Sequence, residues 1–301
     1  MALRLRRLPS DGPQRTRRGG GVRWWVILLF GGYLIYYWFS HQQETSFTGR
    51  TQLVDTTVEQ EAALGLQAYR QILSQSRVTN DPAVTGEVRD IATRLIAAVP
   101  RVEEQMAQAS GTEVDSPLAA FEWEVAVIDS PDVNAFALPG GKIAVHTGII
   151  PIARNQDGLA AIMGHEIAHA LLRHGGERMA HQKLAQIGAL AAGVAISDME
   201  PQQQRAIMAA LGAGAAYGIL LPYSRDHESE ADYVGLMIAA AACYDPREAP
   251  RLWERMAEAA SAQPPEFMST HPSHGSRIQG LEGWMPQALE MREASCGTQA
   301  P

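Results

Sequence analysis

The chain of 301 residues is long enough for one sizeable hydrophobic core or two small domains, and its 46% hydrophobic and 19% charged residues exclude disorder over most of its length. The net charge of −8 is unevenly distributed, because the first 23 residues contain seven arginines and one acidic residue. No basic run occurs in the acidic remainder, which excludes a nucleic-acid-binding protein of the usual basic kind.

The N-terminal region has the composition of a membrane anchor. Residues 1–21 are basic and rich in glycine, which predicts a disordered cytoplasmic segment. Residues 22–40 follow as a predicted transmembrane anchor, because Trp24 to Ser40 carries no charge and has aromatic side chains at both ends. Positive charge before the span places the N-terminus in the cytoplasm and the rest on the periplasmic or extracytoplasmic side.

Two other interpretations of this region remain. A cleaved signal peptide is disfavoured, because bulky aromatic residues stand where small residues should mark a cleavage site. An arginine-rich head poor in acidic residues is also compatible with an organellar transit peptide, which keeps the mitochondrial inner membrane as a minor option. A lipoprotein is disfavoured, since no cysteine lies near the span.

Beyond a polar linker at 41–56, the pattern predicts two helices and then a small sheet. Apolar residues recur at helical spacing in 58–73 and 84–99, and Asp81-Pro82 is a start signal for the second helix. Residues 110–118 are predicted as a loop. Strands are predicted at 121–128, 134–137 and 142–146, the last two joined by a turn at Pro139-Gly140-Gly141. Almost everything that follows is predicted to be helical, which gives an α+β domain with a small antiparallel sheet.

Two features of the second half stay open at this level. Residues 184–196 and 206–221 are apolar and rich in alanine and glycine, and they form either a buried helical hairpin, which their short length favours, or two membrane spans. The two cysteines, Cys243 and Cys296, either form a disulfide outside the cytoplasm or are separate thiols.

A metal-binding motif occurs in the predicted helix 156–173. In His165-Glu166-Ile167-Ala168-His169 the two histidines are four residues apart and share one helix face. They can bind one Zn²⁺, and Glu166 beside them can take a proton from a metal-bound water. The surrounding residues are apolar, so the histidines are buried and require a partner or a metal.

A third zinc ligand is expected from the predicted helix 224–242. Glu228 and Asp232 are four residues apart on that helix, so Glu228 can bind the metal while Asp232 accepts a hydrogen bond from a ligand histidine. Glu230 is expected to be solvated or paired with Arg225. His174 lies close to the motif but out of register, and it is expected to be a histidine at the C-terminus of its helix.

These motifs resemble peptidase family M48. The resemblance rests on Gly164 to His169, on Ser224-Arg225 with Glu228, Glu230, Ala231 and Asp232, on Asn134 to Gly141, and on Thr270-His271-Pro272 with Arg277. It covers residues 57–285 and implies a zincin-like metallopeptidase domain at 57–290, followed by a short tail at 291–301.

The resemblance also implies roles for individual residues. Zn²⁺, one ion per chain, would be bound by His165, His169 and Glu228, with Glu166 as general base. A strand at Asn134, Ala135 and Phe136 would pair with an extended substrate backbone. His271 would contact the oxyanion or cap the zinc in a resting state, and Arg277 would stabilise the tetrahedral intermediate or pair with the neighbours of Glu228.

The predicted function is that of a membrane-anchored zinc metalloendopeptidase, similar to small M48 members that cleave misfolded or unfolded envelope proteins. Its partners are protein or peptide substrates, and nucleic acid is excluded. A chaperone that retains the fold is a rival hypothesis, although it would be free to lose Glu166. A zinc hydrolase of small molecules or lipids is disfavoured by the peptide-binding strand. A latent enzyme, closed by His271 or by residues 184–221, remains open.

Overall fold

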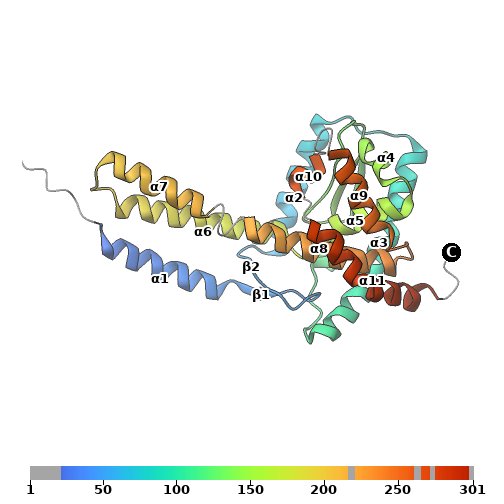
Figure 1. Cartoon of the computed structure of the whole chain (residues 1–301), viewed down its shortest axis with the longest axis horizontal. Helices are drawn as coiled ribbons and strands as arrows, with labels where there is room; N and C mark the ends of the chain where they lie inside the picture. Colours follow the sequence, from blue (N-terminus) through green and yellow to red (C-terminus); the bar gives the residue numbers. More distant parts are fainter. Residues whose placement is uncertain (1–21, 216–220, 261–265, 272–274, 298–301) are drawn as a thin grey trace, which may run out of the picture.

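A computed structural model describes residues 22–215, 221–260, 266–271 and 275–297. The chain forms a helical body around a small sheet, from which three helices project together as an arm (Figure 1). The basic segment 1–21, predicted to be disordered, lies outside the described residues.

The body contains most of the helices and all of the strands. The arm consists of α1 (Trp24–Ser40), α6 (His174–Ala195) and α7 (Pro201–Ala215). The helices of the body are α2 (Val58–Gln75), α3 (Pro82–Ser110), α4 (Ile150–Ala153), α5 (Gln156–Leu171), α8 (Leu221–Ala241), α9 (Glu248–Ala260), α10 (Glu266–Thr270) and α11 (Gly275–Cys296). The strands are β1 (Gln42–Glu44), β2 (Thr51–Leu53), β3 (Glu124–Ile128), β4 (Ala135–Leu138) and β5 (Lys142–His146).

The first two body helices begin at side-chain caps. Thr57 accepts a hydrogen bond from the Gln60 N–H, and the Gln60 side chain accepts one from the Thr57 N–H, which starts α2. Asp81 caps α3 as predicted, with proline in the first turn. This helix runs past its predicted end and through Pro100, and it stops only where Gly111 adopts a φ of 72°.

The main sheet is mixed, so the prediction of an antiparallel sheet was wrong in part. The strand order is β3-β5-β4, with β5 parallel to β3 and antiparallel to β4. The predicted hairpin is present, because Gly140 and Gly141 both take a φ of 82° between β4 and β5. The hairpin returns β5 between the other two strands, which leaves β4 on an edge of the sheet. Helices far outweigh strands, so the α+β class holds.

The core lies where α5 crosses α8. Every residue of α5 from Leu159 to Leu171 except Ala161 is buried, which is possible because the helix is covered by the sheet and by α3, α8 and α9 (Figure 1). Glycines allow α5 and α8 to approach closely: a Cβ placed on Gly235 would lie 2.7 Å from the backbone nitrogen of His165. The crossing brings the two helices predicted to supply ligands into direct contact.

The predicted linker at 41–56 is folded. Its residues form the β1–β2 hairpin, in which the strands pair antiparallel; Phe47 is buried in the core of the body, and Leu53 is buried against Tyr37 of α1 and Ala180 of α6. Arg50, in the hairpin turn, reaches two buried carboxylates, Glu177 of α6 and Glu230 of α8.

The predicted transmembrane anchor forms a helix, but the structure does not support it as a span. In the described residues, no helix combines the length and the apolar character that crossing a membrane requires. The 17 residues of α1 extend about 26 Å, against a hydrocarbon layer of roughly 30 Å.

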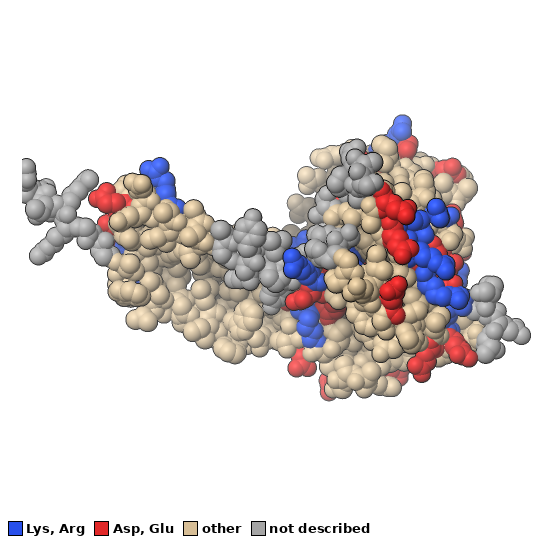
Figure 2. Space-filling model, viewed as in Figure 1, with Lys and Arg blue, Asp and Glu red and all other residues tan. Residues whose placement is uncertain are grey.

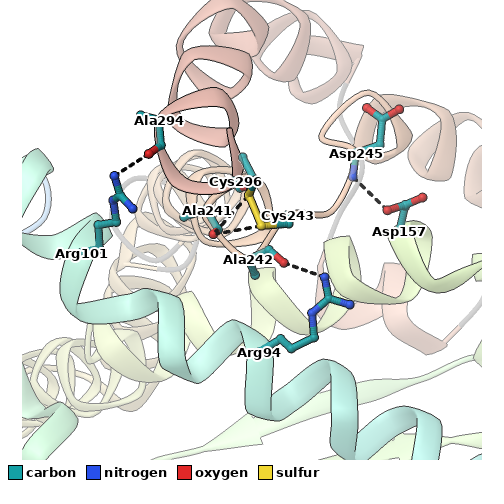
Figure 3. The surroundings of a disulfide bond; sticks show 10 residues. Arg94, Arg101, Asp157, Ala241, Ala242, Cys243, Asp245, Ala294 and Cys296 are labelled. Atoms are coloured by element: carbon teal, nitrogen blue, oxygen red, sulfur yellow. Dashed lines mark hydrogen bonds between the residues drawn. A yellow bond between two sulfur atoms is a disulfide. The ribbon is translucent and has the colours of Figure 1, made fainter. Parts of the chain in front are cut away.

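A disulfide joins the end of α8 to the end of α11. Cys243 and Cys296 are bonded across 53 residues of sequence, which resolves the question that the sequence left open (Figure 3). Arg94 of α3 donates a hydrogen bond to the carbonyl of Ala242 beside it. The disulfide therefore ties the helix that carries Glu228 to the helix that carries Arg277.

Candidate metal centre

The four candidate ligands come from separate parts of the chain and meet in the core. His165 and His169 lie one turn apart on α5, Glu228 on α8 and His271 just after α10. One ligand atom from each lies within 4.8 Å of the others, a separation that allows a single ion to contact all four. The Nε2 atoms of the two α5 histidines are 3.1 Å apart, and the Glu228 carboxylate lies 3.4 Å and 3.5 Å from them.

The outer nitrogens of the two α5 histidines are held by different partners. Nδ1 of His165 lies 3.0 Å from Asp232, the carboxylate that the sequence analysis expected to orient a ligand histidine. Nδ1 of His169 lies 2.8 Å from Nδ1 of His174, whose Nε2 is 3.1 Å from Glu230. An ionised Glu230 accepts the Nε2–H of His174, so His174 accepts from His169. With Nδ1 engaged in this way, both histidines turn Nε2 inward, the nitrogen that a bound metal would use.

Two expectations from the sequence were therefore wrong. His174 does not end its helix, because Arg173 takes a left-handed φ of 56° and a new helix, α6, starts at His174 with the imidazole buried. Glu230 is not solvated, since it is 8% exposed and accepts hydrogen bonds from His174 and Arg50. The signal that was missed is the polar Thr48-Gly49-Arg50 turn of the predicted linker, which supplies the cation for Glu230.

A second polar cluster extends from this point toward the arm. Arg50 donates to both oxygens of Glu177, at 3.0 Å and 2.7 Å, while His227 lies 2.8 Å from the same carboxylate. The rings of His174 and His227 are stacked with centroids 4.1 Å apart. Burial alone would raise the pKa of Glu177, but hydrogen bonds with His181, His227 and Arg50 hold that pKa far below its ordinary value.

Glu166 lies at the boundary between the metal centre and the sheet. Its Oε2 accepts a hydrogen bond of 3.3 Å from the N–H of Ala137 on β4, and its Oε1 is 3.3 Å from Nε2 of His271. Burial raises the pKa of Glu166, because a buried carboxylate loses its hydration. A carboxyl with a raised pKa beside a metal centre is suited to accept and return a proton.

Arg277 is enclosed by acidic side chains. It donates two hydrogen bonds of 2.6 Å to Asp232 and lies 3.0 Å from Glu228, and its guanidinium stacks 3.7 Å from the Trp253 ring. Of the two roles left open by the sequence, this geometry matches pairing with the neighbours of Glu228. Burial favours the neutral form of Glu228, but hydrogen bonds with His165 and His271 outweigh it and lower its pKa.

The residues predicted to bind substrate lie on or beside β4, but they face different directions. Asn134 is buried, and its carbonyl accepts a hydrogen bond from the N–H of His146. Ala135 joins the main core, whereas the half-buried Phe136 packs on the opposite side of the sheet with Tyr69. The structure therefore brings the backbone edge of β4, and not the Phe136 side chain, to Glu166.

Two histidines one helical turn apart, a glutamate between them and a carboxylate from a second helix define the HExxH class of metallopeptidases. Residues 97–285 match peptidase family M48. The chain belongs to this family, as the resemblance of its motifs predicted, and it is a metalloendopeptidase.

Named relatives come from mitochondria and from bacteria. The chain is 34% identical over 262 residues to the mitochondrial metalloendopeptidase OMA1 of Schizosaccharomyces pombe, covering 85% of this chain and 70% of that protein. The human metalloendopeptidase OMA1 is 32% identical over 262 residues, 85% of this chain and 48% of the human protein. The beta-barrel assembly-enhancing protease of Escherichia coli is 28% identical over 228 residues, 74% of this chain and 43% of that protein.

Proposed function

We propose that the protein is a zinc-dependent endopeptidase that cleaves misfolded or unfolded envelope proteins at a membrane. The observation that carries this proposal is the convergence of the Nε2 atoms of His165 and His169 with the carboxylate of Glu228, all buried. Three protein ligands of the types N, N and O are the set that catalytic zinc sites use.

The donor set fits a divalent cation. With their Nδ1 atoms beside Asp232 and His174, the two α5 histidines direct their Nε2 atoms at each other across 3.1 Å. A cation bound between these nitrogens and the Glu228 carboxylate would take the place of the protons that otherwise separate them. Imidazole nitrogens with a single carboxylate favour zinc over magnesium or calcium, which prefer all-oxygen sites.

The residues around the centre supply the other parts of a hydrolytic mechanism. Bound zinc would polarise the scissile carbonyl and lower the pKa of water to near 7. Glu166 would accept the proton of that water and return it to the leaving amine. Its Ala137 hydrogen bond orients the carboxylate for this transfer. Asp232, paired with Arg277, would hold His165 in the ligand tautomer.

An extended peptide is the substrate shape that this site favours. β4 is an edge strand, and the N–H of Ala137 points to Glu166. A peptide added along Asn134 to Ala137 would place one of its bonds at the metal centre. Unfolded segments can take this conformation, whereas folded domains cannot present it. The name of the E. coli relative, beta-barrel assembly-enhancing protease, supports an action on proteins during their assembly.

His271 is proposed to regulate or assist this reaction. Its Nδ1 lies 3.0 Å from Glu228 and 3.3 Å from Nε2 of His165, so it can act as a fourth ligand that closes the site at rest. Moved away from the metal, it could contact the oxyanion.

Attachment to a membrane through α1 is also part of the proposal. Most of the large side chains of α1 are exposed and apolar. The Cys243–Cys296 disulfide is consistent with a body on the extracytoplasmic side, where thiols are oxidised.

The test is cleavage of casein by the purified full-length protein, with zinc, with chelator, and with Glu166→Gln. We expect cleavage that requires zinc and falls at least about 10³-fold in the variant, since it lacks the general base. Zinc-loaded wild type that leaves casein intact would overturn the proposal unless His271→Ala releases activity. Binding of casein without cleavage by either protein would favour a chaperone.

A further inference from the structure

The arm exposes an apolar surface that is unusual for a protein in water. Of the seventeen exposed large hydrophobic side chains in the described residues, ten lie on α1, two on α6 and one on α7. Leu28 is 75% exposed, Leu190 63% and Leu211 47%. Contiguous apolar patches of this extent mark protein or membrane contact sites.

Charged side chains on the arm are confined to its two ends. At the tip, Arg23 pairs with Asp198 at 2.8 Å, and at the base Lys183 pairs with Asp55. Between these pairs α1 carries no charge, α6 carries none after Lys183, and α7 carries none after Arg205. Figure 2 shows the arm as an uncharged surface on this face, with charged atoms at its far end and where it meets the body.

The space between α1 and the α6–α7 hairpin is also apolar. A groove of about 1020 Å³ lies among the three helices and is lined by large apolar side chains (Ile35, Trp38, Leu184, Leu211) and by glycines (Gly188, Gly212). Keeping such a groove filled with water costs roughly 25 cal/mol for each Å² of apolar surface, whereas acyl chains can fill it without that cost.

The ends of the arm match the polar layers of a membrane. Aromatic rings lie at both ends of α1, with Trp24 and Trp25 at the tip and Tyr36 and Trp38 toward the base, as is typical of the membrane–water interfaces. Seven arginines lie in the sequence up to Arg23, directly before α1, and anionic headgroups attract such side chains.

We infer that α1, α6 and α7 together form a lipid-binding unit, so that the α6–α7 hairpin contacts acyl chains alongside α1. The inference rests on the proposed membrane attachment through α1 and extends it to the hairpin. The assembled arm, and not any single helix, makes the lipid contact. Because α6 begins at His174, which contacts His169, insertion of the arm fixes the metal centre close to the membrane surface.

The test uses the full-length protein in nanodiscs of phosphatidylcholine and phosphatidylglycerol. Single cysteines replace Leu28 on α1, Leu190 on α6, Leu211 on α7 and, as a matched control on α2 of the body, Leu64, which is 50% exposed. The native cysteines are joined in the disulfide and do not react with the fluorophore. Nitroxides on the acyl chains and iodide in the water then serve as two quenchers, and casein cleavage verifies each labelled protein.

We expect nitroxide lipid to quench the labels at Leu28, Leu190 and Leu211 several-fold more than the label at Leu64, and iodide to show the reverse order. Labels at Leu190 and Leu211 that respond only to iodide, with Leu28 quenched by lipid, would overturn the inference and leave attachment by α1 intact. Iodide quenching at all four positions, with casein still cleaved, would overturn both the attachment through α1 and the lipid contact of the α6–α7 hairpin. The proposed peptidase activity would remain supported.

Discussion

At the scale of single residues, the proposed metal centre depends on side chains that are not among its candidate ligands. Asp232 contacts one candidate ligand, His165, while His174, held by Glu230 and near Arg50, contacts the other, His169. Such partners fix the tautomer and the ring orientation of a ligand, so their loss weakens metal binding even though every ligand remains.

Replacing His174 tests this dependence. In His174→Ala the Nδ1–H of His169 loses its acceptor, and we expect the zinc dissociation constant to rise about 10–100-fold, measured by competition with a zinc-binding indicator. His181→Ala is the matched control, because His181 is also buried on α6 but lies near Glu177 and not near His169. Equal weakening in the two variants would show that damage to α6, and not the lost acceptor, is responsible.

Glu177 is expected to make stability depend on pH. Its pKa is lowered in the folded protein, so its contribution is present above its unfolded pKa of about 4.3 and is lost as the pH falls further. Glu177→Gln should therefore lower the free energy of unfolding by about 1–3 kcal/mol at pH 7, with a smaller difference below pH 4. Urea denaturation of the metal-free proteins measures this. Exposed Glu87→Gln is the control, and a Glu177→Gln deficit independent of pH would contradict the assignment.

At the scale of elements, the site is created by the contact between α5 and α8. Neither helix holds a complete ligand set, and glycines at the crossing bring them within backbone contact. The distance between the helices therefore determines whether Glu228 reaches the histidines.

Gly235→Ala should separate the two helices. The added Cβ would lie 2.7 Å from the His165 nitrogen and 2.8 Å from the Gly164 carbonyl carbon, and backbone atoms can move only with their helix. We expect a loss of about 1–3 kcal/mol of stability together with weaker zinc binding, measured by denaturation and indicator competition. Gly86→Ala on α3, where a Cβ meets nothing within 4 Å, should retain both. Normal zinc binding by Gly235→Ala would refute this account of the crossing.

At the scale of the whole molecule, metal binding joins distant segments. The candidate ligands come from α5, from α8 and from the residue after α10, so an ion bound only by the folded state adds to its stability.

Removal of the metal should therefore lower the melting temperature. At a free zinc concentration 100 times the dissociation constant, the added stability is about 2.7 kcal/mol. Calorimetry with and without chelator should show the shift in wild type and in Glu166→Gln, which keeps all ligands, and should show none in His169→Ala. A chelator-dependent shift of wild-type size in His169→Ala would place the ion elsewhere.

The sequence determined the chemistry of this protein, because ligand spacing on a helix is a local property. His165 and His169 share a face wherever that helix lies, and the partner pair Glu228 and Asp232 follows the same rule. The α+β class, the β4–β5 turn and the family were predicted for similar local reasons. The sequence analysis singled out Asn134, Phe136 and Arg277, but it did not predict in which direction their side chains point.

Only the tertiary structure decided what lies across a gap in sequence. The parallel pairing of β3 with β5, the start of a new helix at His174 and the reach of Arg50 to Glu230 and Glu177 depend on contacts between segments that no short window contains. The same holds for the arm, since the apolar faces of α1, α6 and α7 become one surface only when the helices are packed side by side. Periodicity reports which residues avoid water, whereas packing determines which of them meet.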